Sequence, residues 1–506
     1  MNLSKKIKLR AIVLCGVAAC LAAFGFFRSR SASIPDSFAT VAQTPKIFPD
    51  YINVTLPYNI APANFVVQEE GEKHVVAISS ENESLVVSGK RAKFPLKAWK
   101  RLLENNKGKD LRVNVYVKTK EGWRGYRPFS EHVSNKPIDG WCVYRSIEPG
   151  YETFSKLRLA QRNLETFEER PLYNVETTGG SRTCVNCHSF QANKPTSFLF
   201  HQRVINPGTI IRRDGEFQKV NLSVGKQGGV FAYPAWRPQG DFVAFSSNDT
   251  FQIFHEKNPN RIEVMDAYSD LYLYDVKSQS LTPIFQTNDV AETFPSWSPD
   301  GKWLYYSSAK FKSEAKLGAE ERYLSTTAQI GRIRYGIWRV FFDETTRTFG
   351  VPELVVDAPS EGASALFARV SPDGNSLIYT RADSGTFPIW RREADLWRFD
   401  LKTRENAPLT NVNSPETESY HSWNSTGDWL VFSSRREDGL FTRLYIAQIG
   451  KDGTATKPFM LPQRDPEDAL RRLKSFNVPE FLTEPVDYSA LKEIVKTAKQ
   501  EARQVK

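Results

Sequence analysis

Short apolar runs separated by turn residues fill the chain between residues 51 and 147. Runs of β-branched and aromatic residues bounded by Gly, Pro, Asn, Asp or Ser are typical of strands. One segment differs, because the apolar residues of PLKAWKRLLENNKGK recur at helical spacing and the segment ends at a glycine. The pattern predicts a β-sandwich-like domain over residues 34–150 with one helix. We expect its strands in the runs YINVTLP, NFVVQ, HVVAISS, SLVVSG, LRVNVYVKT and GWCVYRSI.

A repeated template follows from about residue 195. An aromatic or apolar position precedes a tight turn rich in Pro, Asp and Gly, and an alternating strand and a second strand come after the turn. The four clear copies are YPAWRPQGDFVAFSSN, FPSWSPDGKWLYYSSA, FARVSPDGNSLIYTRA and YHSWNSTGDWLVFSSR. Their spacing exceeds the ~40 to 50 residues of a simple blade, so the loops must carry insertions. The repeat predicts a β-propeller over residues 195–465, with a further blade from FLFHQRVINPGTIIRRDGEFQKVNLS.

Two helical segments are expected outside the repeat. The region 151–194 should begin with a helix from Thr153 to Arg170, which Pro171 stops. The tail 466–506 should be helical, with a terminal helix from about Ser489 that docks its apolar face on the propeller. The apolar positions that define these two helices are Phe154, Leu157, Leu164 and Phe167 in the first, and Leu491, Ile494, Val495 and Ala498 in the second.

Residues 1–33 have the features of an export signal. Lysines and an arginine precede an apolar run from Ala11 to Phe27, as in a secretory signal or a signal anchor. Three outcomes stay open: an uncleaved anchor, cleavage near residues 31–33, or lipidation at Cys20. All three place the rest of the chain outside the cytoplasm, on the periplasmic side of a membrane.

Export makes the cysteines informative, because exported cysteines are usually paired. Apart from the signal region only Cys142, Cys184 and Cys187 remain, so pairing leaves one thiol over. Cys184 and Cys187 with His188 form a Cys-X-X-Cys-His motif, the attachment pattern of haem c, in which two thiols take the vinyl groups and the histidine binds iron. A redox dithiol or disulfide and a zinc site are the alternatives, although neither a βαβ context nor a second metal half-site is visible. Cys142 lies in an apolar strand and is expected to be a buried thiol.

The second axial ligand is less clearly marked. His201 follows the motif closely enough to return over the opposite face of the macrocycle, and it is the first candidate. His255 is the second candidate. Met265 and Met460 have no context that recommends them. Two histidine ligands would favour electron transfer, whereas an open position would allow small-molecule binding.

The WSPDG turn followed by an aromatic strand resembles the TolB-type six-bladed propeller, over roughly residues 195–465. The whole layout is similar to exported TolB-like proteins that carry an N-terminal β domain and one Cys-X-X-Cys-His motif and are often given cytochrome-type names. The resemblance implies a mainly β fold and one covalent haem c, and it implies no reaction. Six blades require one more blade, which the remaining ends of the chain must supply.

Charge and motifs narrow the function classes. The net charge of +10 is spread in mixed-sign segments, which argues against a nucleic-acid partner. About forty residues follow the last blade and no G-x-S-x-G motif is present, which excludes a hydrolase domain. Two hypotheses remain: a membrane-tethered monohaem cytochrome that exchanges electrons with an envelope partner, or a protein-binding scaffold with a structural or sensory haem or a disulfide. A redox enzyme is a weaker third, and no catalytic residue is assigned.

Overall fold

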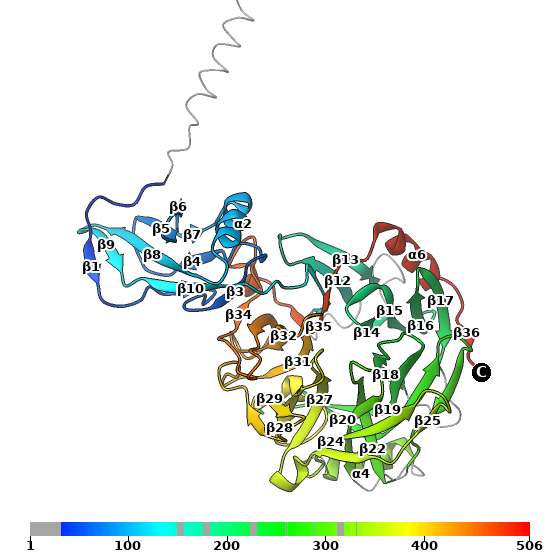
Figure 1. The fold of residues 1–506 in the computed structure, drawn as a ribbon. Helices are drawn as coiled ribbons and strands as arrows, with labels where there is room; N and C mark the ends of the chain where they lie inside the picture. Colours follow the sequence, from blue (N-terminus) through cyan, green and yellow to red (C-terminus); the bar gives the residue numbers. More distant parts are fainter. Residues whose placement is uncertain are drawn as a thin grey trace, which may run out of the picture.

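The computed structural model describes residues 32–148, 156–175, 183–222, 230–258, 260, 262–287, 289–310, 318–329 and 331–506. They fold mainly as β structure, with an N-terminal β domain beside a ring of sheets (Figure 1). The export signal predicted over residues 1–33 lies almost wholly outside the described residues. Within the described residues, no helix has both the length and the apolar character needed to cross a bilayer.

The N-terminal domain packs a seven-stranded sheet against a three-stranded sheet and one helix. The larger sheet runs in the order β1-β9-β8-β10-β3, with β5 and β6 attached to β8, and the smaller sheet is β2-β4-β7. The elements are β1 (Ala39–Val41), β2 (Ile47–Phe48), β3 (Thr55–Pro57), β4 (Phe65–Val67), β5 (Lys73–Ser79), β6 (Ser84–Ser88), β7 (Arg91–Ala92), α2 (Leu96–Asn105), β8 (Asp110–Thr119), β9 (Gly122–Tyr126) and β10 (Phe129–Ser134). The sandwich-like arrangement and its one helix agree with the sequence pattern.

The described residues form six blade sheets around a central channel. Along the chain the last five are β14-β15-β16-β17, β18-β19-β20-β21, β22-β23-β24-β25 with β26, β27-β28-β29-β30 and β31-β32-β33-β34. Their bounds are β14 (Cys184–Gln191), β15 (Lys194–Arg203), β16 (Gly208–Arg213), β17 (Glu216–Asn221), β18 (Val230–Trp236), β19 (Phe242–Phe254), β20 (Ile262–Asp275), β21 (Ser280–Pro283), β22 (Val290–Trp297), β23 (Trp303–Lys310), β24 (Gly336–Asp343), β25 (Thr348–Phe349), β26 (Glu353–Val356), β27 (Ser364–Val370), β28 (Ser376–Ala382), β29 (Asp395–Asp400), β30 (Asn406–Pro408), β31 (Glu418–Trp423), β32 (Trp429–Ser434), β33 (Arg443–Gln448) and β34 (Phe459–Met460).

Both ends of the chain build the remaining blade. Its order is β13-β12-β11-β35, from β11 (Trp141–Ile147), β12 (Arg158–Asn163), β13 (Glu169–Asn174) and β35 (Ser475–Leu482). The inner strand β35 comes from the C-terminal tail and contacts β31 on one side and β14 on the other. This joint sheet closes the ring, and it confirms that the sixth blade comes from the remaining ends of the chain.

Two expectations are wrong in detail. The helix predicted from Thr153 to Arg170 is the hairpin β12–β13 over its described part, and β11 belongs to the propeller rather than to the N-terminal domain. The apolar residues in this segment are spaced as in a helix. However, β12 pairs along its length with β11, and pairing within a sheet can outweigh the local preference for a helix. The tail 466–506 is not wholly helical, because β35 lies between α5 (Asp468–Arg471) and α6 (Tyr488–Ala498), and β36 (Arg503–Gln504) extends the β14 sheet.

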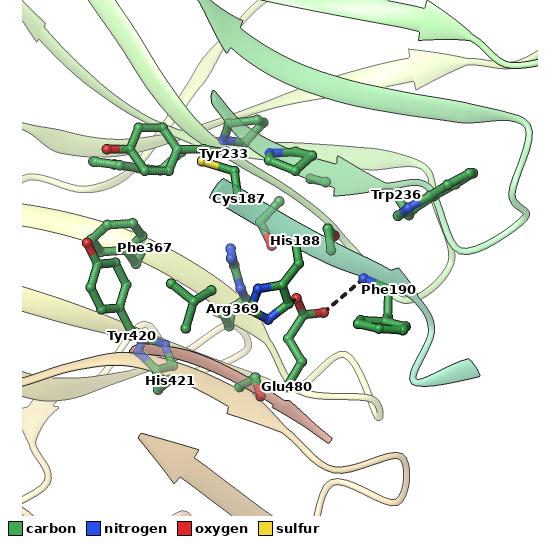
Figure 2. Close-up of a pocket in the computed structure, with 18 of the residues that line it drawn as sticks. Cys187, His188, Phe190, Tyr233, Trp236, Phe367, Arg369, Tyr420, His421 and Glu480 are labelled. Carbon is green, nitrogen blue, oxygen red and sulfur yellow. Dashed lines mark hydrogen bonds and ion pairs between the residues drawn. The ribbon is translucent and has the colours of Figure 1, made fainter. Parts of the chain in front are cut away.

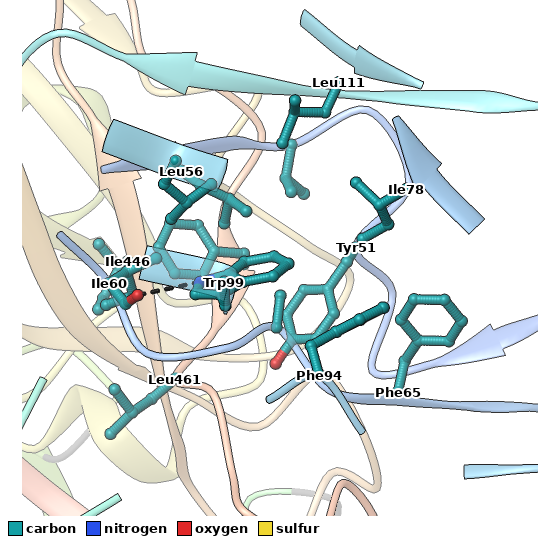
Figure 3. Close-up of a cluster of buried hydrophobic side chains, with 14 of the residues drawn as sticks. Tyr51, Leu56, Ile60, Phe65, Ile78, Phe94, Trp99, Leu111, Ile446 and Leu461 are labelled. Carbon is teal, nitrogen blue, oxygen red and sulfur yellow. Dashed lines mark hydrogen bonds between the residues drawn. The ribbon is translucent and has the colours of Figure 1, made fainter. Parts of the chain in front are cut away.

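One hydrophobic core joins the N-terminal domain to the propeller. Trp99 and Tyr51 of the domain belong to the same buried cluster as Ile446 and Leu461 of the β31–β34 blade (Figure 3). The Trp99 indole donates a hydrogen bond to the Ile60 carbonyl at 3.1 Å, and the Tyr51 hydroxyl donates to the Met460 carbonyl at 3.1 Å. The domain is therefore fixed to the outer side of this blade.

Candidate functional site

The six inner strands share one backbone feature. Each has a residue with positive φ between 47° and 57°, at or beside an irregularity in its pairing with the next strand. The six residues are Cys187, Tyr233, Phe294, Phe367, Tyr420 and Val478. The sequence CHSF at Cys187 therefore takes the same place as YPAW, FPSW, FARV, YHSW and VPEF in the other blades. The second half of the Cys-X-X-Cys-His motif is thus also the inner-strand bulge of its blade.

Aromatic side chains occupy four of these six positions. The ring centroids of Phe294 lie 4.4 Å from Tyr233 and 4.0 Å from Phe367, and Phe367 lies 4.9 Å from Tyr420. The two smaller residues, Cys187 and Val478, stand on β14 and β35, which contact each other. The aromatic cluster consequently fills one side of the channel and leaves the side of the motif less filled.

A cavity of about 700 Å³ occupies the channel. Cys187, His188, Arg369, Tyr420 and Glu480 are among its lining residues (Figure 2). A volume of this size is in the ordinary range for a cofactor or a small ligand. The long hairpin β19–β20 bounds part of it through residues including Asn248, Thr250, Gln252 and Val264.

His188 is a buried, neutral imidazole. Burial and, to a smaller extent, the nearby Arg145 charge lower its pKa to about 3, against a raising effect of the Val478 main chain. Its Nε2 atom lies 3.5 Å from Glu480 Oε1, and neither ring nitrogen makes a hydrogen bond of normal geometry within the described residues. A neutral imidazole with unsatisfied nitrogens has the protonation state that an iron ligand needs.

Glu480 is the acidic side chain of this cavity. Its Oε2 atom accepts a hydrogen bond from the Phe190 main-chain N–H at 3.0 Å. Burial raises the pKa of Glu480 to about 7, against the lowering effects of that hydrogen bond and of the Arg369 charge. Because Oε1 faces Nε2 of His188, iron binding through Nε2 would require the Glu480 side chain to move aside.

The two thiols of the motif have different surroundings. Cys187 lines the cavity and is partly exposed, whereas Cys184 lies in a buried cluster with Trp141, Val185 and Phe190. Burial raises the pKa of Cys184, and the Arg145 and Arg203 charges oppose that rise. The three cysteines that the structure describes are free thiols, and Cys142 is buried as expected. Cys187 and His188 thus fit an attached haem directly, while Cys184 stands where β14 begins, just after residues 176–182, which lie outside the described residues.

The structure does not bring His201 to this cavity. His201 stands on β15 opposite Asn186, its Nδ1 lies 2.9 Å from Thr209 Oγ1, and its ring packs 5.8 Å from that of Phe245. Its side chain therefore lies among the strands of neighbouring blades. His255 is also absent from the cavity lining.

His421 is the histidine that the sequence analysis passed over. It lines the cavity on β31 at the position equivalent to His188, and its Nε2 lies 2.9 Å from the Ile378 carbonyl. Burial lowers the pKa of His421 to about 3. The sequence signal that could have identified His421 is the similarity of CHSF and YHSW. This similarity places His421 at the position of His188 once both segments are aligned as inner-strand bulges.

Within the part of the chain that the structure describes, no group of three or more His, Cys, Asp or Glu side chains is arranged to hold a metal ion.

Fold and site together define a class: a six-bladed β-propeller, joined to an N-terminal β domain, with a Cys-X-X-Cys-His motif in its channel wall. No protein-family model matches the chain, and no curated protein matches it by sequence. Among solved structures it resembles TolB from Acinetobacter baumannii, at 14% identity over 73% of this chain and 78% of TolB, with a TM-score of 0.42.

Two further solved structures are similar to this chain at low identity. The tricorn protease matches at 11% identity over 79% of this chain and 43% of its own, with a TM-score of 0.34. An oligogalacturonate lyase in complex with manganese matches at 14% identity over 76% of this chain and 99% of its own, with a TM-score of 0.32. The blade count given above rests on this chain's own sheets, and these likenesses assign no activity to it.

Proposed function

We propose that the protein is a monohaem c-type cytochrome whose haem is attached through Cys184 and Cys187 and bound at iron by His188. The observation that carries the proposal is His188 itself. It is a buried neutral imidazole with unsatisfied ring nitrogens, in the wall of a 700 Å³ cavity and next to the free thiol of Cys187. Few other roles account for an imidazole left in that state at the end of a Cys-X-X-Cys-His motif.

The surroundings of the motif support the same conclusion. The two smallest bulge residues, Cys187 and Val478, lie on adjacent inner strands, so a planar group attached at Cys187 would find the less filled side of the channel. The aromatic cluster around Phe294 and Phe367 would shield one side of that space from water. Burial of this kind is one of the factors that set the reduction potential of a haem.

Electron transfer is the activity that this arrangement supports. A bound haem would supply a one-electron couple, and the chain contributes its attachment, its axial imidazole and its shielding. We assign no catalytic residue. With Nδ1 of His201 against Thr209 and its ring outside the cavity lining, His188 is the one axial ligand assigned.

Location and partners follow from the first residues of the chain. The signal pattern of residues 1–33 supports export and a membrane tether on the periplasmic side, with cleavage or lipidation as alternative fates. The expected partner is a redox or structural protein of the cell envelope, and nucleic acid is not expected. The resemblance of the repeat to TolB-type propellers is consistent with this location.

The deciding experiment is a visible spectrum with a haem stain after denaturing electrophoresis, on full-length protein exported with the c-type maturation machinery. We expect covalent haem with reversible reduction in the wild type and none in Cys184→Ala/Cys187→Ala. His201→Ala is the matched control, because it removes a buried imidazole that does not line the cavity, and it should keep the haem. Unmodified wild-type protein from cells that mature another c-type cytochrome would refute the proposal.

A protein-binding scaffold is the second candidate, and the open channel itself favours it. Channel mouths of propellers are common binding surfaces, and a large cavity lined by aromatic and charged side chains needs no haem to bind a partner. In that case Cys184 and Cys187 would form a disulfide or remain thiols. The haem stain and a thiol titration separate the two candidates. Free thiols or a disulfide at Cys184 and Cys187, without haem, would leave the scaffold as the remaining candidate.

A further inference from the structure

Two arginines in the channel wall have no carboxylate partner among the described residues. Arg145 on β11 and Arg203 at the end of β15 both line the cavity. Arg203 donates one hydrogen bond, at 2.9 Å, to the Phe231 carbonyl, and Arg145 makes no hydrogen bond or ion pair among the described residues; its Nε is buried and unsatisfied. Neither guanidinium forms an ion pair with a carboxylate of the described residues.

Some of the other little-exposed arginines of the described chain pair with carboxylates, whereas the buried Arg162 and Arg435 donate to main-chain carbonyls. Arg237 pairs with Asp241 and Glu344, both at 2.6 Å, and Arg391 pairs closely with Glu263. Such pairing is the usual way to offset the cost of removing a charge from water. An unpaired guanidinium that faces a cavity is instead ready to bind an anion there, because its planar donors match a carboxylate.

The two arginines approach one region of the channel. Arg203 stands directly opposite Cys184 in the β14–β15 pairing, and Arg145 stands opposite Asn477 of β35, the strand on the other side of β14. Both charges act on Cys184, since each opposes the rise of its pKa that burial causes. A ligand beside Cys184 would therefore lie between them.

The cavity lining contains little acidic charge that could neutralise Arg145 and Arg203. Glu480 is the acidic residue among those that line it, and its charge interacts with Arg369, the third arginine of the lining. The positive charges of Arg145 and Arg203 are consequently left without compensation.

We propose that Arg145 and Arg203 form a carboxylate-binding site on the Cys184 side of the central channel. Two sources of carboxylate fit this chemistry: the propionate groups of a haem attached at Cys184 and Cys187, or a free carboxylate ligand in the channel. The first source rests on the function proposed above, and the second does not.

Titration calorimetry with citrate as the probe tests the site on the exported full-length chain. The starting protein is Cys184→Ala/Cys187→Ala, which cannot hold covalent haem, so that the channel is free. We expect citrate to bind it, and Arg145→Gln or Arg203→Gln on this background to weaken binding about 10-fold each, the ordinary effect of losing one charge-assisted contact. Arg145→Lys should restore part of the loss.

Arg124→Gln is the matched control, because Arg124 lies on β9 of the N-terminal domain and pairs with Glu121 on the surface. It should bind citrate like the starting protein, and unchanged thermal unfolding should show that each variant is folded. Absence of citrate binding at millimolar concentration, or equal binding by the arginine variants and the control, would overturn the proposal.

The wild-type protein distinguishes the two sources. If it carries haem and binds no citrate while the thiol-free protein does, the propionates occupy the site. If both bind citrate equally, the site takes a free carboxylate ligand, with or without haem. A negative haem stain together with citrate binding would refute the cytochrome and keep the arginine site.

Discussion

At the scale of single residues, the Cys-X-X-Cys-His motif coincides with a backbone feature of the propeller. Cys187 and His188 belong to a haem-attachment pattern, and they also occupy the bulge that every inner strand carries at the equivalent place. Because the bulge re-aims side chains locally, it presents Cys187 to the channel while His188 packs beside Glu480. The backbone therefore fixes the motif before any ligand binds.

A second residue-scale feature is the isolated carboxyl of Glu131. It is fully buried on β10, neither oxygen has a hydrogen-bond partner within the described residues, and burial raises its pKa to about 8. Below pH 4.5 the Glu131 carboxyl is protonated in both the folded and the unfolded state. As the pH rises from 4.5 towards about 8, the unfolded state loses this proton while the folded state keeps it, so the free energy of unfolding decreases.

We therefore expect Glu131→Met to remove this pH dependence. The variant should gain stability over the wild type as the pH rises from about 5 to 8, by at most ~1.4 kcal/mol per pH unit. Urea unfolding at several pH values measures this, with the exposed Glu72→Gln as control. A difference between variant and wild type that is the same at pH 5 and pH 8 would contradict the assignment.

At the scale of elements, the tail shows how a short helix is fixed by packing. The carboxylate of Asp487 caps α6 by accepting a hydrogen bond from the Ala490 N–H at 2.7 Å, and it pairs with Arg212 at 2.7 Å. Ile494 and Ala498 bury the apolar face of the helix in the cluster that contains Phe198 of β15. The predicted docking of this helix on its own propeller is thus confirmed.

Ile494→Ala should destabilise the protein by about 2–5 kcal/mol, because Ile494 is fully buried and its truncation leaves a cavity. Leu473→Ala is the matched control, since Leu473 lies in the same tail but is 53% exposed, and it should change stability by less than about 0.5 kcal/mol. Chemical denaturation of both variants measures the difference. Equal effects would mean that α6 does not contribute to the folded core.

At the scale of the whole molecule, the N-terminal domain and the propeller share one hydrophobic core. The cluster around Trp99 continues into the β31–β34 blade, and the blade that closes the ring takes β11 from before the repeats and β35 from after them. The N-terminal domain shares no sheet with the propeller, but separating the two would expose the core that they share.

We therefore expect Trp99→Ala to lower the free energy of unfolding by about 3–5 kcal/mol. The whole molecule should still unfold in a single transition, at a lower temperature than the wild type. Differential scanning calorimetry measures the number of transitions, and hydrogen exchange of the propeller strands shows whether they open with the domain. Two separate transitions, with only the first shifted, would show that the domain unfolds independently. Trp123→Ala, a partly exposed residue on β9, is the control.

Local sequence patterns were sufficient to predict the class of fold and to identify the residues of the motif. Turn chemistry and alternation identify strands from local positions alone, so four blades, the sandwich-like domain and α2 could be read directly. Cys184, Cys187 and His188 are marked by spacing, which needs no tertiary information. The prediction of a helix from Thr153 was wrong because it used local spacing alone. The apolar positions there fit a helical period, but local spacing does not show that the segment pairs with β11.

Which residues meet in the channel depends on how the blades pack around the ring. Ring closure by β35 places Glu480 beside His188, although they are far apart in the sequence, and it brings Arg145 near Cys184. It also separates His201 from the cavity and brings His421 to it, against the expectation from sequence distance. The physical reason is that a propeller channel is lined by one short segment from each blade, so neighbours in the site come from register around the ring and not from proximity along the chain.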